Sequence, residues 1–486
     1  MESNRYAINW RTIIQNIDII KAKEINLYPK KWRKNLKKVL LVFPNRYYIG
    51  MSNLGFHTIF KKINEIDDVI CERGFYPYPV SFETKTPFNE FELIIFSISF
   101  EIDFLNVIDM LIKSGIELFK KKRKKPFLTA GGIAITLNPF ILKEIFDVQL
   151  IGEGEELIIE FVKNFFTDKE KIYSIEGVFS ENKEIKRRIY TGNYIAHSTI
   201  LTENTEFSNY FLIEISRGCP YSCYFCAGSH NYRPYREKDY NEILKLFENF
   251  NGKIKKVGLI GSSVLSHKKF FDICNYLIEK NIDFSVSSLR LDKINDEVLR
   301  LLKLGKNSSF TVAIEAGSER LRKLINKKLS DEKIFYAIDL FIKHKILNLK
   351  FYFMIGLPGE KWDDVEKIVE IIEKIKKEYL KNKKYLKHLG AFTISVNPFI
   401  PKRNTPFFKY PIDKFDISTT KISFLKKRLK KIPNVKVQVE DITKSYIQCL
   451  LSKDDGKFLP FLIEKVKKRI SDKKFVFSFI DKIEKM

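Results

Sequence analysis

The stretch that decides the fold is Arg217-Gly-Cys-Pro-Tyr-Ser-Cys-Tyr-Phe-Cys226, which directly follows an apolar run that we predict to be a strand. Its cysteines, Cys219, Cys223 and Cys226, have the spacing C-x3-C-x2-C, whereas the other three cysteines of the chain are scattered singly. Thiolates are soft ligands for iron–sulfur clusters and for zinc. A zinc site is usually closed by four ligands, and His230 is the only nearby candidate for a fourth. Three thiolates on a cubane cluster leave one iron open, and a catalytic cluster requires such an open iron.

The cysteine loop ends the first of six predicted strands, which alternate with helical stretches between about residues 209 and 406. A strand–helix repeat of this kind predicts a partial (β/α)6 barrel of the TIM type, with its chemistry at the C-terminal strand ends. The predicted strands are Phe211–Ser216, Lys256–Gly261, Asp283–Ser287, Ser309–Glu315, Asn348–Gly356 and Gly390–Pro398.

Residues 36–165 show a second alternation of short, continuous apolar runs with predicted helices. Such runs indicate a parallel sheet covered on both faces, and therefore a doubly wound, Rossmann-like domain. The predicted strands are Lys38–Phe43, Asp68–Cys71, Leu93–Ser99, Pro126–Ala130 and Val148–Ile151. Because ligands of such sheets bind at the strand ends, we expect cofactor-binding residues there. The candidates are Ser52, Gly55, Gly131, Gly132, Gly152 and Gly154.

These patterns predict an α/β protein of five segments. A helical N-terminal extension (1–35) precedes the Rossmann-like domain (36–165), and a linker with hairpins (166–208) leads to the barrel (209–406). A Lys-rich, mainly helical region (407–486) follows.

The composition adds a weaker indication. With 86 Lys and Arg against 60 Asp and Glu, the formal charge is +26, which is typical of a chain with an anionic partner such as nucleic acid, a nucleotide or a membrane surface. The basic residues are spread along the chain, however, which favours a general composition bias. No apolar stretch approaches the ~18 residues of a membrane-spanning helix, and the N-terminus lacks the layout of a secretion signal. We therefore expect a cytoplasmic protein without a membrane span.

The cysteine motif resembles that of the radical S-adenosylmethionine (SAM) superfamily. The resemblance implies a 4Fe–4S cluster bound by Cys219, Cys223 and Cys226, whose open iron binds the amino and carboxylate groups of SAM. It further implies reductive cleavage of SAM to a 5′-deoxyadenosyl radical that abstracts hydrogen from a substrate. An electron donor such as flavodoxin or ferredoxin is the partner that this chemistry implies.

The resemblance extends to other strand ends. Phe225 occupies the aromatic position that the family packs near adenine, a role compatible with ordinary core packing. Gly261 and Ser262 end the second barrel strand, where family members often carry Gly-Gly-Glu, so backbone carbonyls would replace the missing acid. Gly356 and Pro358 match the Gly-rich segment that lies against adenine, and a strand-to-helix turn is the alternative interpretation.

Charged and polar residues end the third and fourth strands. Ser287 and Arg290 end the third, and Arg290 is expected either to pair with the SAM carboxylate or to form a structural salt bridge. Glu315 ends the fourth, where the family binds the ribose hydroxyls or the amino group. Its alternative is a structural pair with Arg320.

The N-terminal domain resembles that of the radical SAM subgroup with a cobalamin-binding-like domain. The resemblance rests on Tyr48–Gly55, Thr129–Gly132 and Ile151–Glu155. The Asp-x-His-x-x-Gly motif that supplies an axial histidine is absent, and His57 does not fit it. Either cobalamin binds without a protein histidine or the fold persists without the cofactor, and we expect binding. Methyl transfer or other C–H functionalisation of an unknown substrate, small or macromolecular, is then implied.

The same residues bear on three alternative functions. A tRNA methylthiolation enzyme would use the basic charge, but such enzymes carry three more cluster cysteines in an N-terminal domain, and this one has only Cys71. A radical SAM enzyme without cobalamin is a further alternative. An interaction protein with a structural cluster would not need Gly356 or Glu315 at the strand ends.

Overall fold

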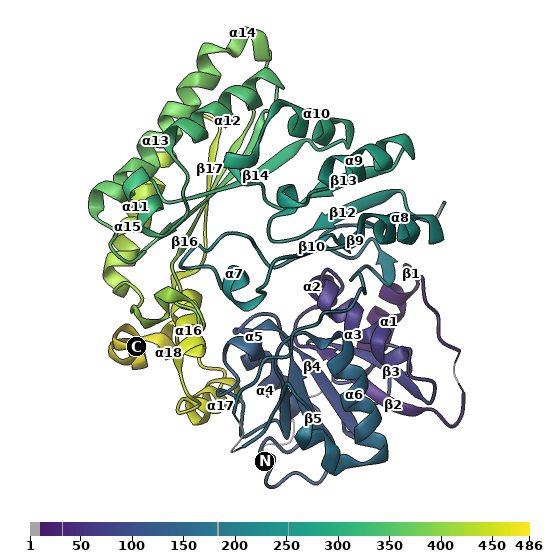
Figure 1. Ribbon diagram of the computed structural model, residues 1–486. Coiled ribbons are helices and arrows are strands. Elements are labelled where there is room, and N and C mark those ends of the chain that lie inside the picture. The colour runs from purple at the N-terminus through teal and green to yellow at the C-terminus, as the bar shows by residue number, and fades with distance from the viewer. Residues whose placement is uncertain (1–9, 32, 182–183, 251) are drawn as a thin grey trace. The chain divides into compact units, whose positions relative to one another are not determined.

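The computed structural model of the chain describes residues 10–31, 33–181, 184–250 and 252–486 (Figure 1). The chain forms two compact units. The first comprises Met1–Phe211 and Asp454–Ser471, and the second comprises Leu212–Lys453 and Asp472–Met486. Both are α/β structures with parallel strands, which confirms the predicted fold class. The predicted extension falls partly on residues 1–9, which lie outside the described residues.

The first unit is built on a six-stranded sheet of order β3-β2-β4-β5-β6-β7. Its strands are β2 (Lys37–Phe43), β3 (Val69–Phe75), β4 (Leu93–Ser97), β5 (Phe127–Gly131), β6 (Val148–Leu150) and β7 (Val178–Phe179). The first five are parallel, and β7 pairs with β6 in the antiparallel sense. All five predicted strands are present. Numbered along the chain, the parallel strands have the flavodoxin-like order 2-1-3-4-5, whose switch point lies between β2 and β4.

Both faces of this sheet are covered, as continuous apolar strands require. On one face, Val39 and Leu41 of β2 share a core with residues of helices α3 (Leu54–Asn64) and α6 (Gly154–Thr167), which pack against each other. Leu40 points to the opposite face, because side chains alternate along a strand, and it is equally buried.

Further elements complete the first unit. Its other helices are α1 (Trp10–Lys21), α2 (Tyr47–Gly50), α4 (Asp103–Lys113), α5 (Ile133–Leu137) and α17 (Leu459–Lys467), the last of which contacts α4. The hairpins predicted for residues 166–208 are not what the described residues form. Instead, β7 joins β6 at the edge of the six-stranded sheet, and β8 (Ile200–Thr202) pairs with β1 (Glu24–Asn26) in a separate two-stranded sheet, so both strands pair with partners outside this segment.

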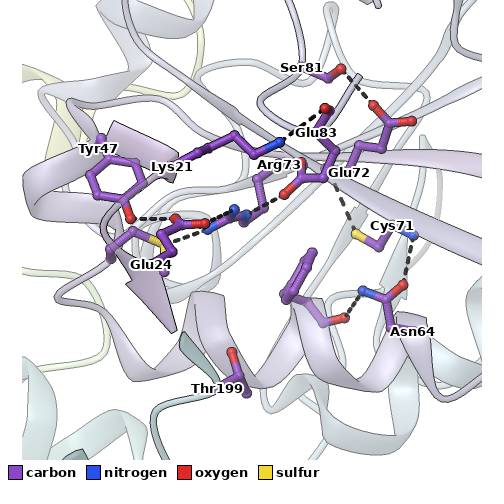
Figure 2. Close-up of polar contacts among 12 residues, drawn as sticks. Lys21, Glu24, Tyr47, Asn64, Cys71, Glu72, Arg73, Ser81, Glu83 and Thr199 are labelled. Atoms are coloured by element: carbon purple, nitrogen blue, oxygen red, sulfur yellow. Dashed lines mark hydrogen bonds and ion pairs between the residues drawn. The ribbon is translucent and has the colours of Figure 1, made fainter. Parts of the chain in front are cut away.

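A buried ionic network ties β1 to the sheet (Figure 2). Arg73 on β3, whose side chain is 2% exposed, donates to both oxygens of Glu24 at 2.7 and 2.8 Å and to Glu83 at 2.7 Å. The Tyr47 hydroxyl also donates to Glu24. Burying a guanidinium is costly unless it is paired and hydrogen-bonded, so these partners stabilise the attachment of the N-terminal segment.

The second unit contains two sheets, of order β13-β12-β9 and β14-β15-β16-β17. The strands are β9 (Phe211–Glu214), β12 (Lys256–Ile260), β13 (Asp283–Val286), β14 (Ser309–Glu315), β15 (Asn348–Ile355), β16 (Phe392–Pro398) and β17 (Val435–Val439). A parallel bridge between Leu289 and Val312 links the two sheets just beyond β13. A short antiparallel pair, β10 (Ser216–Arg217) and β11 (Arg236–Glu237), flanks the cysteine loop.

Helices alternate with these strands as predicted. They are α7 (Ala227–Asn231), α8 (Tyr240–Asn249), α9 (Phe270–Glu279), α10 (Asp296–Leu304), α11 (Glu319–Leu324), α12 (Asp331–Lys343), α13 (Trp362–Lys381) and α14 (Lys383–Leu386). The C-terminal region is mainly helical, with α15 (Phe415–Leu429), α16 (Ile442–Lys453) and α18 (Asp472–Lys485). The prediction missed β17, which extends the sheet beside β16. In the described part of the chain, no helix is long and apolar enough to cross a membrane.

Candidate functional site

The cysteine loop runs from the end of β10 to the first residue of α7, which Cys226 precedes. Cys223 is 6% exposed, and Cys219 and Cys226 are half-buried. None of the three forms a disulfide. The donor set that the sequence predicted is therefore available as three thiols on one loop.

The segment that follows β14 holds this loop in place. The Tyr224 N–H donates to the Ile325 carbonyl at 3.1 Å, and the Asn326 side chain donates to the Ser222 carbonyl at 2.8 Å. Phe225 packs against an apolar cluster at the strand ends, and its position near adenine stays a prediction. The cluster comprises Ala316, Leu321, Ile325, Leu357, Phe399 and Phe407. The loop is thus fixed against the ends of β14, β15 and β16.

Burial and nearby charges have opposite effects on the pKa of the thiols. Burial raises the pKa of Cys219 and of Cys223, because it disfavours the charged thiolate. The positive charges of Lys327 and Arg290 lower the pKa of both thiols. Since iron is bound by the thiolate, these two cations favour the form that an iron–sulfur cluster needs.

His230 does not present its Nε2 to the thiols. Nε2 contacts the Cys223 carbonyl at 3.1 Å, and burial lowers the pKa of the ring, so the neutral imidazole donates there. Among the described residues, no three His, Cys, Asp or Glu side chains are gathered around a single-ion position. Three thiols on one loop, with two cations that favour their thiolate form, supply the donor type that an iron–sulfur cluster requires.

The predicted residues at the second and third strand ends lie close together. The Ser287 hydroxyl donates to the Gly261 carbonyl at 3.2 Å. Gly228, in α7, faces both the Cys226 sulfur and the Ser262 hydroxyl, each 3.8 Å from where its Cβ would stand. The structure therefore brings Gly261, Ser262 and Ser287 to the edge of the cysteine loop.

Arg290 forms the salt bridge that was one of its two expected roles. It donates to both oxygens of Asp292, at 3.0 and 3.2 Å, and to the Lys327 carbonyl at 3.3 Å. Its guanidinium stacks on the ring of Tyr221, 3.6 Å from the ring centroid. Arg290 is thereby placed against the cysteine loop, where its role toward a SAM carboxylate stays a prediction.

Glu315 occupies a strained position at the end of β14. Its φ is +73°, at a shift in the register between β14 and β15, and left-handed backbone is unfavourable for residues other than glycine. Its carboxylate accepts from Lys327 Nζ at 3.1 Å, with the two side chains 14% and 6% exposed. The predicted structural pairing of Glu315 with Arg320 is wrong, because Arg320 lies in the first turn of α11 and pairs with Asp364 instead.

The Gly-rich segment turns from β15 into α13. At Gly356, a Cβ would lie 3.1 Å from the Cβ of Asp413, so this chain's own side chain fills the space there. Pro358 is half-buried in the same turn. The buried Glu360 pairs with Lys421 at 2.9 Å and accepts from the Leu357 N–H at 3.2 Å. The segment is a well-fixed strand-to-helix turn, and its contact with adenine stays a prediction.

The candidate glycines of the first unit make room for its own backbone. Gly132 has φ +103°, and a Cβ there would lie 2.4 Å from the Ile98 carbonyl oxygen. Gly152 has φ +109°, and a Cβ there would lie 2.2 Å from the Arg188 carbonyl oxygen. These contacts explain both glycines without a ligand, so a role of theirs in cofactor binding stays a prediction.

The remaining candidates of that unit also have internal contacts. Gly154 packs helix α6 against Ile59 of α3, and Gly131 ends β5 beside Leu150. The Ser52 hydroxyl donates to the Tyr48 carbonyl at 2.7 Å and accepts from the Glu206 N–H at 3.0 Å. Gly55 lies in the first turn of α3, where the Asn53 side chain caps the helix.

Sequence reasoning missed a polar cluster at the switch point between β2 and β4. Asn45 and Asn106 donate to one oxygen of Asp103, at 2.8 and 3.2 Å. The other oxygen of Asp103 is buried and has no hydrogen-bond partner among the described residues. Burial raises the pKa of this carboxyl to about 7. Asn53 links the same two loops by donating to Ser99 at 3.0 Å.

The side chain of His57 is buried and makes hydrogen-bond contacts within the first unit. It is 1% exposed, its Nδ1 accepts from the Thr199 N–H at 3.1 Å, and its Nε2 contacts the Met51 carbonyl at 3.0 Å. Burial lowers the pKa of the ring to about 4, so the imidazole is neutral. Neither ring nitrogen is therefore available to a metal in this conformation.

Comparisons with known proteins place the chain in a family. The family models for the radical SAM superfamily and for the N-terminal region of radical SAM proteins match residues 213–372 and 55–191. The chain is 32% identical over 440 residues to the uncharacterized protein MJ0966 of Methanocaldococcus jannaschii, covering 88% of this chain and 91% of that protein. The chain belongs to the radical SAM superfamily and is an enzyme of that superfamily.

Two further similarities concern activity and fold. The ribosomal protein uS12 methylthiotransferase RimO of Clostridioides difficile is 24% identical over 308 residues, 60% of this chain and 63% of RimO, which is less than two thirds of its length. The radical SAM methyltransferase TsrM of Kitasatospora setae, solved with cobalamin and a [4Fe–4S] cluster, shares the fold with a TM-score of 0.55. That alignment has 13% identity and covers 77% of this chain and 74% of TsrM. Superfamily membership implies a 4Fe–4S cluster, SAM and a reductant.

Proposed function

We propose that Cys219, Cys223 and Cys226 hold the 4Fe–4S cluster and that SAM binds across the neighbouring strand ends. The observation that carries this proposal is the tethered cysteine loop, whose thiols lie within the electrostatic influence of Lys327 and Arg290. When bound, the reduced cluster and SAM together supply a 5′-deoxyadenosyl radical.

The chain's own residues then bind and orient the nucleotide. Glu315 offers a carboxylate at the end of β14, directed by its strained backbone, to a ribose hydroxyl or an amino group. Ser262 and Ser287 offer hydroxyls beside the loop, and the Gly356–Pro358 turn offers backbone to the adenine. Arg290, stacked on Tyr221 of the cysteine loop, offers positive charge to the carboxylate of SAM.

We propose further that the first unit binds cobalamin without a protein histidine, for methyl transfer or another C–H functionalisation. Support comes from the 2-1-3-4-5 strand order, which creates a binding position at the switch point, and from the fold shared with the cobalamin-bound TsrM. His57 is engaged by Thr199 and Met51, which agrees with a cofactor that takes no histidine from this chain.

A second candidate is methylthiolation, favoured by the similarity to RimO. Those enzymes use additional cluster cysteines in an N-terminal domain. The first unit has Cys71 alone, which is 2% exposed, and burial raises its pKa well above the ordinary value. We therefore rank methylthiolation below the cobalamin-dependent reaction.

The deciding experiment is cofactor analysis of anaerobically purified, full-length protein. Iron and sulfide are measured per chain, the protein is incubated with hydroxocobalamin and desalted, and the visible spectrum is recorded. We expect about four irons per chain and about one retained cobalamin with a base-off spectrum. About eight irons without cobalamin would instead support methylthiolation, whereas four irons without cobalamin would leave a radical SAM enzyme that lacks the second cofactor.

A further inference from the structure

Lys327 is a buried cation that no feature of the sequence singles out. It is 6% exposed, whereas its neighbour Lys328 is exposed. Lysine is rarely buried unless it is paired, because its charge loses hydration. The partner here is Glu315, whose carboxylate lies 3.1 Å from Lys327 Nζ.

The backbone around Lys327 is fixed in a costly conformation. Asn326 and Lys328 both have left-handed φ angles, +57° and +51°, on the two sides of Lys327. The same segment clamps the cysteine loop, since the Ile325 carbonyl accepts from the Tyr224 N–H and Asn326 donates to Ser222. The residues that hold the cysteine loop are thus immediate neighbours of the lysine.

Lys327 also belongs to one assembly with Arg290. The Arg290 guanidinium donates to the Lys327 carbonyl and stacks on Tyr221, between Cys219 and Cys223 in the sequence. The two carboxylate oxygens of Asp292 accept hydrogen bonds from two nitrogens of Arg290, so the positive charge of Arg290 has a bidentate partner. Among the residues that the structure describes, the carboxylate that pairs with Lys327 is that of Glu315, the residue proposed to bind SAM.

We propose that Lys327 is a positioning residue that supplies positive charge toward the cluster and holds the Glu315 carboxylate at the strand end. This inference rests on the proposed function of the three cysteines. A cluster with three thiolate ligands is anionic, and reduction adds one further negative charge from the external reductant. A nearby cation stabilises the reduced form more than the oxidised form, and a nearby carboxylate does the opposite. The Lys327–Glu315 pair therefore adjusts how easily the cluster accepts its electron.

The test is a potentiometric titration of the cluster in the full-length protein without SAM, followed by its visible absorption. Lys327→Gln should shift the midpoint potential to more negative values, and Lys327→Arg should restore it. Glu315→Gln should shift it in the opposite direction, because it leaves the lysine charge uncompensated. Lys328→Gln, which removes the same charge from the adjacent exposed residue, is the matched control and should leave the potential unchanged.

Failure of the role of Lys327 and failure of the proposed cluster site give different results. A wild-type protein without any iron–sulfur absorption overturns the proposed function itself. A cluster whose potential in Lys327→Gln equals that in Lys328→Gln overturns the role of Lys327 alone. If Lys327→Gln fails to retain a cluster, Glu315→Gln decides, and a potential that does not rise in that variant overturns the inference.

Discussion

The strand ends of the two units carry different chemical groups. In the first unit, Gly132 and Gly152 let the chain's own carbonyls approach, and at the switch point amides donate to the carboxyl of Asp103, whose pKa is raised to about 7 by burial and by the nearby Glu101. In the second unit, the strand ends present thiols and full charges, among them Arg290 and Glu315.

The difference teaches which kind of ligand each unit suits. Charged groups and thiolates bind an anionic cluster and a charged nucleotide through strong, directed interactions. Amides and close-fitting backbone suit a large ligand that is held by shape and by neutral hydrogen bonds. The comparison therefore predicts that single substitutions act strongly in the second unit and weakly in the first.

The largest effect is expected at the cysteines. Cys219→Ala should abolish the broad visible absorption of the cluster, because a lost thiolate leaves an iron without its ligand. Cys274→Ala, which replaces a fully buried cysteine outside the loop, should retain the absorption and serves as the control. The visible spectrum of Cys71→Ala tests whether the cysteine of the first unit is a cluster ligand. Loss of the cluster in that variant would contradict the assignment of three ligands to the second unit.

Glu315→Ala should have the next largest effect. Removing a charged hydrogen-bonding partner of SAM costs about 1.5–3 kcal/mol, so affinity should fall roughly 10- to 150-fold while the cluster remains. Equilibrium binding of SAM to the reconstituted protein measures this loss, and iron content reports the cluster. Arg320→Ala is the control, since Arg320 pairs with Asp364 and not with Glu315. Equal affinity in the wild type and the Glu315 variant would return Glu315 to a structural role.

The sequence predicted the parts of this site that depend on local spacing. The cysteine loop and the strand ends follow from a short motif and from apolar runs, so Cys219, Gly261 and Glu315 fall where expected. The missed strand β17 lies in a Lys-rich stretch whose alternation, Val435-Lys-Val-Gln-Val439, is too short to outweigh its surroundings.

Residues whose role depends on backbone conformation were not predictable in this way. Lys327 and Lys328 are adjacent and identical in type, and the left-handed backbone of Asn326 and of Lys328, which the sequence does not reveal, accompanies the burial of Lys327 and the exposure of Lys328. The partner of Glu315 was misassigned because α11 begins at Glu319 and carries Arg320 toward Asp364. Asp103 and Asn45 are 58 residues apart along the chain, and they meet only because β2 and β4 are neighbours in the sheet.

A smaller effect, on stability, is expected from Asp103. Its pKa is raised from 3.8 to about 7 in the folded protein, so the folded state holds the proton more tightly than the unfolded state. This group's contribution to stability is therefore full below about pH 4, falls as the pH rises toward 7, and is constant above that. Asp103→Asn should remove this fall.

Thermal unfolding of both proteins between pH 4 and 8 measures the Asp103 contribution as a difference. The difference is needed because His57 and His197, whose pKa values burial lowers to about 4, contribute with the opposite sign below pH 6.5. If the difference between wild type and Asp103→Asn does not change with pH, the carboxyl is not held protonated by its surroundings.

The smallest effect on cofactor binding is expected at His57, which lies two residues after the stretch Tyr48–Gly55 that resembles the cobalamin-binding-like domain. Its Nδ1 accepts from the Thr199 N–H and its neutral ring lies against the Met51 carbonyl, so the imidazole stabilises the fold of the first unit. His57→Ala should lower the free energy of unfolding by about 2–3 kcal/mol through the cavity and the lost hydrogen bonds. Affinity for hydroxocobalamin, measured at a temperature where the variant is folded, should stay within about twofold. A different result would be a tenfold loss of affinity and a visible spectrum of the bound cobalamin that differs from the wild-type spectrum. That result would mean that the His57 ring leaves Thr199 and Met51 to reach the cobalt.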